Sequence, residues 1–280
     1  MKKIAITGAS GLVGTRIIEL LSDRFEFIPL AQENMDITEK DSVHSYLKNI
    51  SYDLLLHLAA YTNVIGAETE KEKAYAINET GTKNLLDVVS SAKKEFIYIS
   101  TDFVFDGVNP PYNEKSIPNP ISVYGASKYA GEKVVGNSGM IVRISYPYRA
   151  EYGIKKDIFR TLKSLLEAKK PLTMVSDSLM VPTFIDDIAQ GLGYLMNNFT
   201  NDTVHIVGKD AMSPYTLAKT IARMFSLDES LVGKTTYEQY FVNKAKGPRY
   251  SDIKSIKNTF YPMHSFEEGL SIIKNQLNII

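Results

Sequence analysis

The sequence predicts an α/β protein with a parallel sheet covered by helices on both faces, and three observations lead to this fold class. Short β-rich runs alternate with helical patterns through the first half of the chain. The run at residues 54–59 is almost continuously apolar, as expected of a strand covered on both sides. A glycine-rich turn separates the first strand from the first helix. Such alternation favours parallel pairing through right-handed crossovers.

The elements can be placed in order along the chain. Strands are expected at residues 3–7, 25–30, 54–59, 96–100 and 140–145. Helices are expected where apolar positions recur at helical spacing, at residues 12–21, 79–92 and 123–135. After about Arg149 the alternation loosens, and helical patterns separated by short extended pieces follow at residues 158–168, 186–197, 215–225 and 266–277.

The turn at Thr7–Gly14 has the residue types that a phosphate-binding loop needs. Gly8, Gly11 and Gly14 follow a strand and open an amphipathic helix. Small residues let the backbone turn sharply and approach a pyrophosphate, while free N–H groups at the helix start face the phosphates. Ser10 adds a hydroxyl donor. The turn predicts a Rossmann-type doubly wound sheet that binds a dinucleotide; the alternative is a glycine turn without a ligand.

The segment after the second strand bears on the choice of cofactor. It reads Leu30-Ala31-Gln32-Glu33 and contains no basic residue. An acid at this place suits the ribose hydroxyls of NAD, whereas an arginine suits the 2′-phosphate of NADP. Glu33 can take the ribose role or be a solvated loop acid. The sequence therefore predicts NAD(H) or NADP(H), with NAD(H) slightly favoured.

The looser pattern after Arg149 predicts a second, smaller part of the chain. We expect residues 1–148 to form the dinucleotide-binding domain, with residues 177–200 returning to it. Residues 149–176 and 201–280 are expected to form a smaller C-terminal α/β lobe that binds substrate.

Composition excludes several classes of protein. The chain has 280 residues and a formal net charge of zero, so no basic field attracts nucleic acid or an anionic membrane. It has no cysteine, and its four histidines lack metal-ligand spacing, so no metal is expected; His57 lies in a strand as a core residue. The N-terminus lacks a signal-peptide pattern and no apolar run could span a bilayer, which predicts a cytoplasmic protein. A homodimer is compatible with these features.

Tyr124 and Lys128 are the candidate catalytic pair, since residues four apart on a helix share one face. A lysine ammonium beside the phenol lowers the tyrosine pKa from about 10, which suits proton exchange with a substrate oxygen. Tyr129 and Lys133 have the same spacing. However, Tyr124 follows a proline-rich loop and the strand ending at Thr101, whose hydroxyl can reach the same point. The pattern predicts hydride transfer between a nicotinamide and a carbonyl or alcohol; the alternative is a packed aromatic beside a solvated lysine.

Three motifs together resemble the extended short-chain dehydrogenases/reductases: Thr7–Gly14, Ser100-Thr101-Asp102 and Tyr124–Lys128. The finer pattern is similar to the dTDP-4-dehydrorhamnose reductase family. Further matching stretches are Met35–Thr38, Leu58–Thr62, Ala67-Glu68, Ile77-Asn78, Gly81, Asn84-Leu85, Phe103–Gly107, Gly131-Glu132 and Arg143. The resemblance implies NAD(P)H-dependent reduction of the 4-keto group of a nucleotide-linked deoxysugar, dTDP-4-dehydro-L-rhamnose to dTDP-L-rhamnose, with Tyr124 as proton donor.

The resemblance also implies roles for individual residues. The catalytic residues would be Thr101, Tyr124 and Lys128. Cofactor contacts would come from Gly8, Ser10, Gly11, Leu12, Val13, Asp36, Ile37, Leu58, Ala59, Ala60, Tyr61, Asn78, Tyr124 and Lys128. Substrate contacts would come from Thr101, Asp102, Val104, Tyr146 and Arg249. Asn78 could instead cap the helix that follows it.

Three positions depart from the family pattern. Ile65 stands where the family usually has an aspartate, and Tyr146 where it commonly has a tryptophan. Gly247 stands where the family tends to have a basic residue before a proline. Arg249 belongs to a run of basic residues that can meet the diphosphate of a nucleotide sugar or form a solvated face.

Two other functions fit parts of the pattern. A nucleotide-sugar epimerase or dehydratase would recycle tightly bound NAD. The dehydratases usually have an Asp-Glu pair beside the catalytic threonine, whereas Thr101 is followed by Asp102-Phe103. A non-catalytic regulatory subunit resembling that of methionine adenosyltransferase would keep the nucleotide fold. Such a module has no need of Tyr124 and Lys128, so the sequence favours the reductase.

Overall fold

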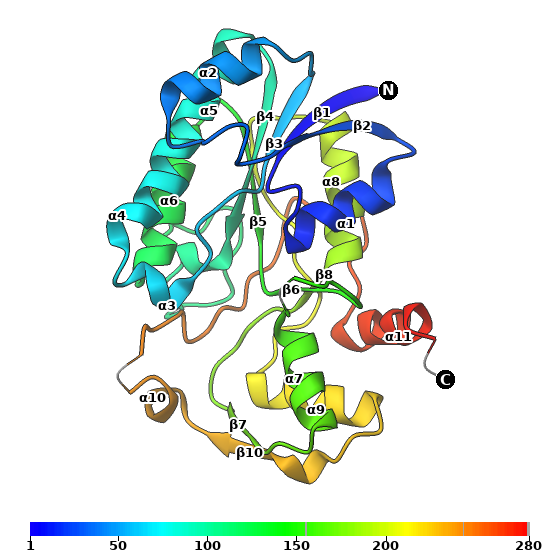
Figure 1. Cartoon of the computed structure of the whole chain (residues 1–280). Helices are drawn as coiled ribbons and strands as arrows, with labels where there is room; N and C mark the ends of the chain where they lie inside the picture. Colours follow the sequence, from blue (N-terminus) through cyan, green and yellow to red (C-terminus); the bar gives the residue numbers. More distant parts are fainter. Residues whose placement is uncertain (155, 243, 279–280) are drawn as a thin grey trace.

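A six-stranded parallel sheet forms the centre of the computed structural model, which describes residues 1–154, 156–242 and 244–278 (Figure 1). The strand order is β2-β1-β3-β4-β5-β9. These strands are β1 (Lys2–Thr7), β2 (Phe25–Leu30), β3 (Leu54–His57), β4 (Glu95–Thr101), β5 (Met140–Ile144) and β9 (Thr203–His205). The chain passes from β1 to β2 on one side and then to β3 on the other, so the sheet has a topological switch point beside β1. The predicted doubly wound fold is confirmed.

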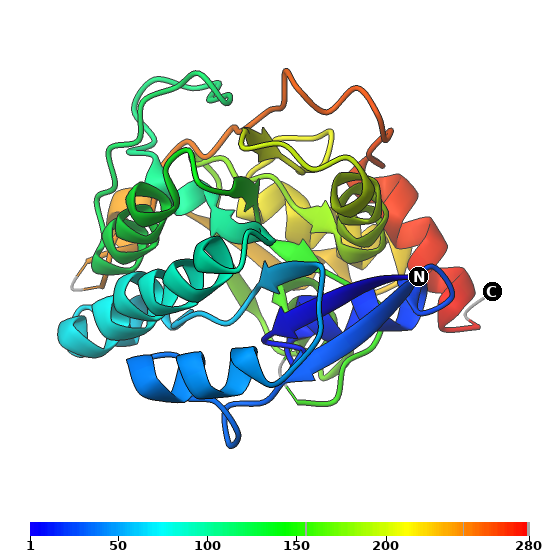
Figure 2. The ribbon, with the colours of Figure 1, turned by 90° about the horizontal axis from the view of Figure 1, so that it is seen from above.

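Helices cover both faces of the sheet (Figure 2). One face packs against α1 (Leu12–Leu21) and α8 (Ile185–Asn197), and the other against α2 (Lys40–Lys48), α5 (Thr82–Ser91) and α6 (Val123–Val135). Side chains alternate along each strand, so Ile97 and Ile99 of β4 face α1 and α8, whereas Phe96 and Tyr98 face the other layer. Burial on both sides explains why the central strands are apolar at nearly every position.

The helix expected at residues 79–92 begins earlier than predicted. After α3 (Val64–Ala67), the chain turns through α4 (Lys71–Tyr75), a π-helical turn (Ala76–Gly81) and α5 without a break. The sequence obscures this start because Asn78 and Gly81 are weak helix formers. Within the described part of the chain, none of the helices combines the length and apolarity needed to cross a membrane.

A smaller lobe lies at the bottom of Figure 1. It contains α7 (Ile158–Glu167), β7 (Leu172–Val175), α9 (Pro214–Met224), β10 (Val232–Thr235) and α10 (Tyr237–Tyr240), with β7 and β10 paired in parallel. Two short strands, β6 (Pro147–Tyr148) and β8 (Thr183–Phe184), pair where the two parts meet, and α11 (Phe266–Gln276) ends the described chain. The sequence assigned residues 201–280 to this lobe, whereas β9 pairs with β5 in the main sheet. A three-residue strand is too short to reveal itself by periodicity.

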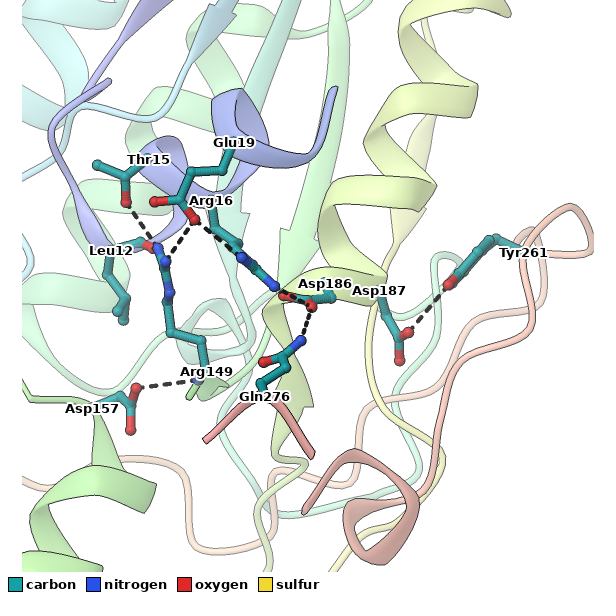
Figure 3. A network of polar contacts seen from close by, with 10 residues as sticks. All are labelled: Leu12, Thr15, Arg16, Glu19, Arg149, Asp157, Asp186, Asp187, Tyr261 and Gln276. Atoms are coloured by element: carbon teal, nitrogen blue, oxygen red, sulfur yellow. Dashed lines mark hydrogen bonds and ion pairs between the residues drawn. The ribbon is translucent and has the colours of Figure 1, made fainter. Parts of the chain in front are cut away.

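Ion pairs tie the connection to the lobe onto α1 and α8 (Figure 3). Arg149, which directly follows β6, pairs through Nη2 with Glu19 of α1 at 2.8 Å. Arg16 binds the carboxylate of Asp186 at the start of α8 through Nε and Nη2, each of which lies 2.7 Å from one carboxylate oxygen. Gln276 of α11 donates to the same carboxylate at 2.8 Å. Elements from both ends of the chain thus meet at the start of α8.

We expect Arg16→Ala to lower the free energy of unfolding by about 1–2 kcal/mol, because it removes a bidentate, charge-assisted contact from a half-buried carboxylate. Equilibrium urea unfolding followed by circular dichroism measures the change. Lys83→Ala is the control: it breaks only the exposed Lys83–Asp87 pair and should cost less than about 0.5 kcal/mol. Equal losses in the two variants would contradict the role given to Arg16.

Candidate active site

The glycine turn lies between β1 and α1 and is held by backbone contacts that leave no space for side chains. Gly8 has φ +66°, and a Cβ placed on it would lie 2.8 Å from the backbone nitrogen of Ala59. A Cβ on Gly14 would lie 2.3 Å from the carbonyl oxygen of Gly8. In the described structure no side chain caps α1 at Gly11, so the first N–H groups of the helix remain available to an anion. This cradle fits the pyrophosphate of a dinucleotide.

His57, at the end of β3, connects this turn to the layer of helices behind it. Its Nδ1 lies 2.7 Å from Thr7 Oγ1 and its Nε2 lies 3.2 Å from Thr82 Oγ1. Thr7 Oγ1 also accepts a hydrogen bond from Ala59 N at 3.1 Å, which places Leu58–Ala60 beside the glycine turn. Burial lowers the pKa of His57 to about 3, so the ring is neutral at physiological pH. His57 is a core residue with both nitrogens engaged, as predicted.

Asn78 fixes the segment that follows β3. Its Oδ1 accepts from Tyr61 N at 2.8 Å, and its Nδ2 lies 3.2 Å from Tyr61 O and 2.9 Å from Ser127 Oγ on α6. Because Asn78 lies inside the π-helical turn, it does not cap the following helix, which is the alternative that the sequence left open. It joins the loop after β3 to the helix that bears Tyr124.

Asp36 and Ile37 follow β2. The Asp36 carboxylate accepts hydrogen bonds from Thr38 N at 2.9 Å and Thr38 Oγ1 at 2.8 Å, and Asn84 Nδ2 donates to Ile37 O at 2.9 Å. The Asp36 carboxylate therefore stabilises a local turn through its hydrogen bonds with Thr38. Glu33 is exposed.

The start of α6 lies directly against the end of β4. Ser122 caps the helix by accepting from Gly125 N at 3.2 Å. A Cβ on Gly125 would lie only 2.2 Å from the carbonyl oxygen of Phe103. The missing side chain at Gly125 therefore lets α6 reach the strand end, and this contact brings Tyr124 to Thr101.

Tyr124 is the phenol at the centre of the site. The sequence predicted a lowered pKa for Tyr124, and this is wrong for the described structure: burial raises the pKa to about 12, and the charge of Asp102 adds to the rise. A hydrogen bond with Thr101 opposes it. The phenol is therefore protonated at neutral pH, which is the state that a proton donor requires.

Lys128 lies one helical turn further along α6 and is only 3% exposed. Its Nζ donates to the carbonyl oxygen of Ile99 at 2.7 Å and lies 4.1 Å from the centroid of the Tyr98 ring. Burial lowers the pKa of Lys128 to about 7, and the charge of Glu132 opposes this shift. Lys128 is therefore buried, and the alternative of a solvated lysine, which the sequence left open, is wrong.

Asp102 is buried beside Thr101. One carboxylate oxygen accepts from Thr101 Oγ1 at 3.0 Å, and the other accepts from the hydroxyl of Ser251 in the C-terminal part of the chain. Burial raises the pKa of Asp102, and these hydrogen bonds oppose the rise. The C-terminal segment is thus fastened directly to the candidate active site.

Phe103 and Tyr146 form an aromatic wall that the sequence revealed only in part. The Phe103 ring lies 5.5 Å from that of Tyr124 and 6.1 Å from that of Tyr146. Tyr146 has φ +38°, an unfavourable backbone conformation for a bulky residue that is found most often at functional sites. Phe103 was missed because an aromatic next to a catalytic motif looks the same in sequence as a core residue.

Two residues expected at the substrate have other contacts. Val104 is fully buried in a cluster with Phe105 and Val181, so its side chain packs in the core rather than facing the site. Arg249 pairs through Nη2 with the Asp177 carboxylate at 2.6 Å and donates from Nε to the Asp177 carbonyl at 3.1 Å. Its side chain remains about one third exposed.

A glycine turn at the switch point after β1, with a threonine, a tyrosine and a buried lysine at the end of β4, defines a protein of the short-chain dehydrogenase/reductase type. The chain belongs to the RmlD substrate binding domain family, whose sequence profile matches residues 1–278. This confirms the resemblance found in the sequence.

Relatives of known structure and name support this assignment. The chain is 32% identical over 255 residues to a dTDP-4-dehydrorhamnose reductase of Aggregatibacter actinomycetemcomitans, covering 87% of this chain and 84% of that protein. The crystal structure of dTDP-4-dehydrorhamnose reductase from Bacillus anthracis in complex with NADP has a TM-score of 0.91 and 32% identity, covering 99% of this chain and 100% of that one. A Clostridium acetobutylicum dTDP-4-dehydrorhamnose reductase structure has a TM-score of 0.89 and 30% identity, covering 99% of both chains.

Gly8→Ala should lower affinity for a dinucleotide by at least about tenfold, because Cβ would collide with the Ala59 backbone at a positive φ. Isothermal titration with NADH and NADPH measures the loss. Gly153→Ala is the matched control, since a Cβ there would have no described atom within 4 Å. Unchanged affinity in Gly8→Ala would place the dinucleotide elsewhere.

Lys128→Met should remove a pH dependence of stability. The Lys128 pKa is about 7 in the folded chain and 10.5 in an unperturbed lysine, so the unfolded chain binds more protons between these values. The destabilisation from the buried ammonium is complete below about pH 7 and is lost as the pH rises towards 10.5. Wild-type stability should therefore rise relative to Lys128→Met between about pH 7.5 and about pH 9.5.

Urea unfolding at several pH values checks this expectation, with the exposed Lys133→Met as the control. A stability difference between wild type and Lys128→Met that stays constant with pH would show that burial does not depress this pKa.

Proposed function

We propose that the chain reduces the 4-keto group of a nucleotide-linked deoxysugar, converting dTDP-4-dehydro-L-rhamnose to dTDP-L-rhamnose. The observation that carries this proposal is the meeting of Thr101, Tyr124 and Lys128 where β4 ends. The named relatives support the substrate class. In this proposal residues 1–148, with residues 177–200 returning to the same domain, hold the dinucleotide. The smaller lobe together with the C-terminal segment holds the sugar nucleotide.

The proposed reaction is a ketone reduction in which the protein manages one proton. The hydride for the new C–H bond at C4 would come from the reduced nicotinamide when it is bound. As the C=O π bond breaks, the electron pair moves to oxygen, and the Tyr124 phenol transfers its proton there. The Thr101 hydroxyl donates a hydrogen bond to the same oxygen. Solvent then returns a proton to Tyr124.

The surroundings of Tyr124 suit both stages of this transfer. Before transfer, burial and the charge of Asp102 keep the phenol protonated, as the raised pKa indicates. After transfer, the ammonium of Lys128 on the same helix face stabilises the phenolate. A donor that is protonated at rest and stabilised when ionised is what ketone reduction at neutral pH requires.

The residues present fit a nicotinamide dinucleotide. In the proposed arrangement, the pyrophosphate is surrounded by residues of the glycine turn and the start of α1: Gly8, Ser10, Gly11, Leu12 and Val13. The adenine lies near Asp36 and Ile37. The segment Leu58–Tyr61 follows the ribose and pyrophosphate, and Asn78 supports that segment. The tight approach of Gly8 to Ala59 and the uncapped start of α1 support the first of these assignments.

The sugar is proposed to bind against Phe103 and Tyr146, with Asp102 near its hydroxyl groups. The rings of Phe103 and Tyr146 provide an apolar face of the kind on which sugars pack. Arg249, whose side chain is about one third exposed, would meet the diphosphate through its guanidinium. The Val104 contribution is limited to its backbone because its side chain is in the core.

Tyr124→Phe should lower kcat at least about 100-fold, because the proton donor is lost while the ring remains. The assay follows the absorbance of NADH or NADPH with freshly generated dTDP-4-dehydro-L-rhamnose. Tyr129→Phe is the control and should retain activity, since Tyr129 packs beside the buried cluster around Val104 and Phe105. Turnover that survives in Tyr124→Phe but not in Tyr129→Phe would transfer the role to the second tyrosine.

Wild-type protein that does not oxidise NADH or NADPH in this assay would point to the other functions. Retention of NAD through purification, with sugar conversion but no net oxidation, indicates an epimerase or dehydratase. Absence of all turnover, with recovery of a stoichiometric partner protein, indicates a regulatory subunit.

NADH should support turnover at least as well as NADPH. The loop from Ala31 to Glu39 contains three acids and no lysine or arginine, so it offers no cation to a 2′-phosphate. Comparing kcat/KM for the two reduced cofactors measures the preference, and Glu33→Gln tests whether the exposed acid contributes to it. A large preference for NADPH would contradict this expectation.

A further inference from the structure

We propose that Tyr98 is a positioning residue for the catalytic lysine: its buried ring holds the Lys128 ammonium through a cation–π contact. The catalytic consequence of this inference rests on the proposed function. The contact itself is a property of the folded chain and can be tested without substrate.

The geometry of the contact is that of a desolvated cation–π pair. Lys128 Nζ lies 4.1 Å from the Tyr98 ring centroid, and Tyr98 is 0% exposed. The same nitrogen donates to Ile99 O at 2.7 Å. A cation over an aromatic ring within about 6 Å is attracted by the electron-rich face, and the attraction is larger where water is excluded. The Tyr98 ring and the Ile99 carbonyl together fix the position of the Lys128 ammonium.

The ring itself is held from several sides. The Tyr98 hydroxyl donates to the carbonyl oxygen of Lys128 at 3.3 Å, so the phenol is fixed to the helix that carries the lysine. A Cβ on Gly131 would lie 2.4 Å from that hydroxyl oxygen. The His57 ring lies 5.6 Å away on β3. Tyr98 therefore has little freedom to move away from the ammonium.

Among the described residues, Lys128 has no carboxylate as a direct partner. Glu132 on the same helix acts on it electrostatically, but Arg143 binds the Glu132 carboxylate at 2.8 and 2.6 Å. His57 on β3 is neutral, and Tyr124 on α6 is protonated at neutral pH. The ring of Tyr98 and the carbonyl of Ile99 are thus the direct partners that favour the ammonium over the neutral amine.

Removing the ring therefore has a defined electrostatic effect. Burial already lowers the pKa of Lys128 to about 7, and loss of the cation–π contact lowers it further. Less ammonium is then present at neutral pH to stabilise the Tyr124 phenolate. The expected kinetic effect is a lower kcat, with the basic limb of its pH profile moved to lower pH and with little change in KM.

The first test compares Tyr98→Leu with Tyr98→Phe, which retains the ring. Phe96→Leu is the matched packing control, because Phe96 is equally buried on the same strand and in the same core cluster. We expect Tyr98→Leu to lower kcat about tenfold, Tyr98→Phe to remain within about threefold of wild type, and Phe96→Leu to leave the pH profile unmoved. A loss in Phe96→Leu equal to that in Tyr98→Leu, with the same pH profile in both, overturns the proposal.

A second measurement separates this inference from the proposed function. In protein labelled with [ε-¹³C]lysine, the Lys128 resonance is identified by its absence in Lys128→Met, and its shift is followed against pH without substrate. The titration midpoint should fall in Tyr98→Leu and stay near the wild-type value in Tyr98→Phe and Phe96→Leu. If the midpoint falls in Tyr98→Leu but the wild-type protein is inactive, the contact is supported and the proposed function is rejected. If the midpoint does not move in Tyr98→Leu, the contact is rejected, whatever the activity of the wild-type protein.

Fluorinated phenylalanines at position 98 cover the case in which Tyr98→Leu does not fold. Increasing fluorination weakens the electron-rich face of the ring while nearly preserving its shape. The Lys128 midpoint should fall stepwise from phenylalanine to pentafluorophenylalanine. The same midpoint throughout this series would overturn the proposal.

Discussion

The close approach of α6 to the sheet is the constraint on which the site depends. At Gly125 the helix touches the carbonyl of Phe103, and at Gly131 it touches Asn78 O and the Tyr98 hydroxyl, with no space for a Cβ at either point. Tyr124, directly before Gly125, reaches Thr101, and Lys128, between the two glycines, reaches Ile99 O. A larger residue at either glycine would push the helix away and separate the phenol and the ammonium from the strand end. The packing of α6 against the sheet therefore also sets the positions of the catalytic side chains.

Burial shifts the pKa values of two neighbouring groups in opposite directions. It raises that of Tyr124 to about 12 and lowers that of Lys128 to about 7, because in each case the charged form is disfavoured. The site thus contains a phenol that keeps its proton and a lysine that is poised to change charge. Such a pair suits proton delivery to a ketone oxygen at neutral pH. The nearby Glu132 carboxylate binds Arg143 with both oxygens, so it favours the Lys128 ammonium through its charge and not through a direct contact.

The parts of the site that were predictable from sequence are those defined by local pattern. The turn at Gly8 and the spacing of Tyr124 and Lys128 are motifs whose neighbours along the chain supply their context. The resemblance named Asn78 but not its contacts, which are with residues 17 and 49 positions away, and Tyr98, which contacts a lysine 30 positions away, was missed. No local pattern records such contacts. The short strand β9 was assigned to the wrong part of the molecule for the same reason, since only its pairing with β5 places it.

Transfer of deuterium tests the proposed reduction most directly. The purified chain would be incubated with [4,4-²H₂]NADH and dTDP-4-dehydro-L-rhamnose, and the sugar product analysed by proton NMR and mass spectrometry. Hydride transfer to the ketone predicts one deuterium at C4 of the product sugar and none elsewhere. A reduced sugar without deuterium at C4, or a converted sugar with all deuterium still on the cofactor, would contradict the proposed function.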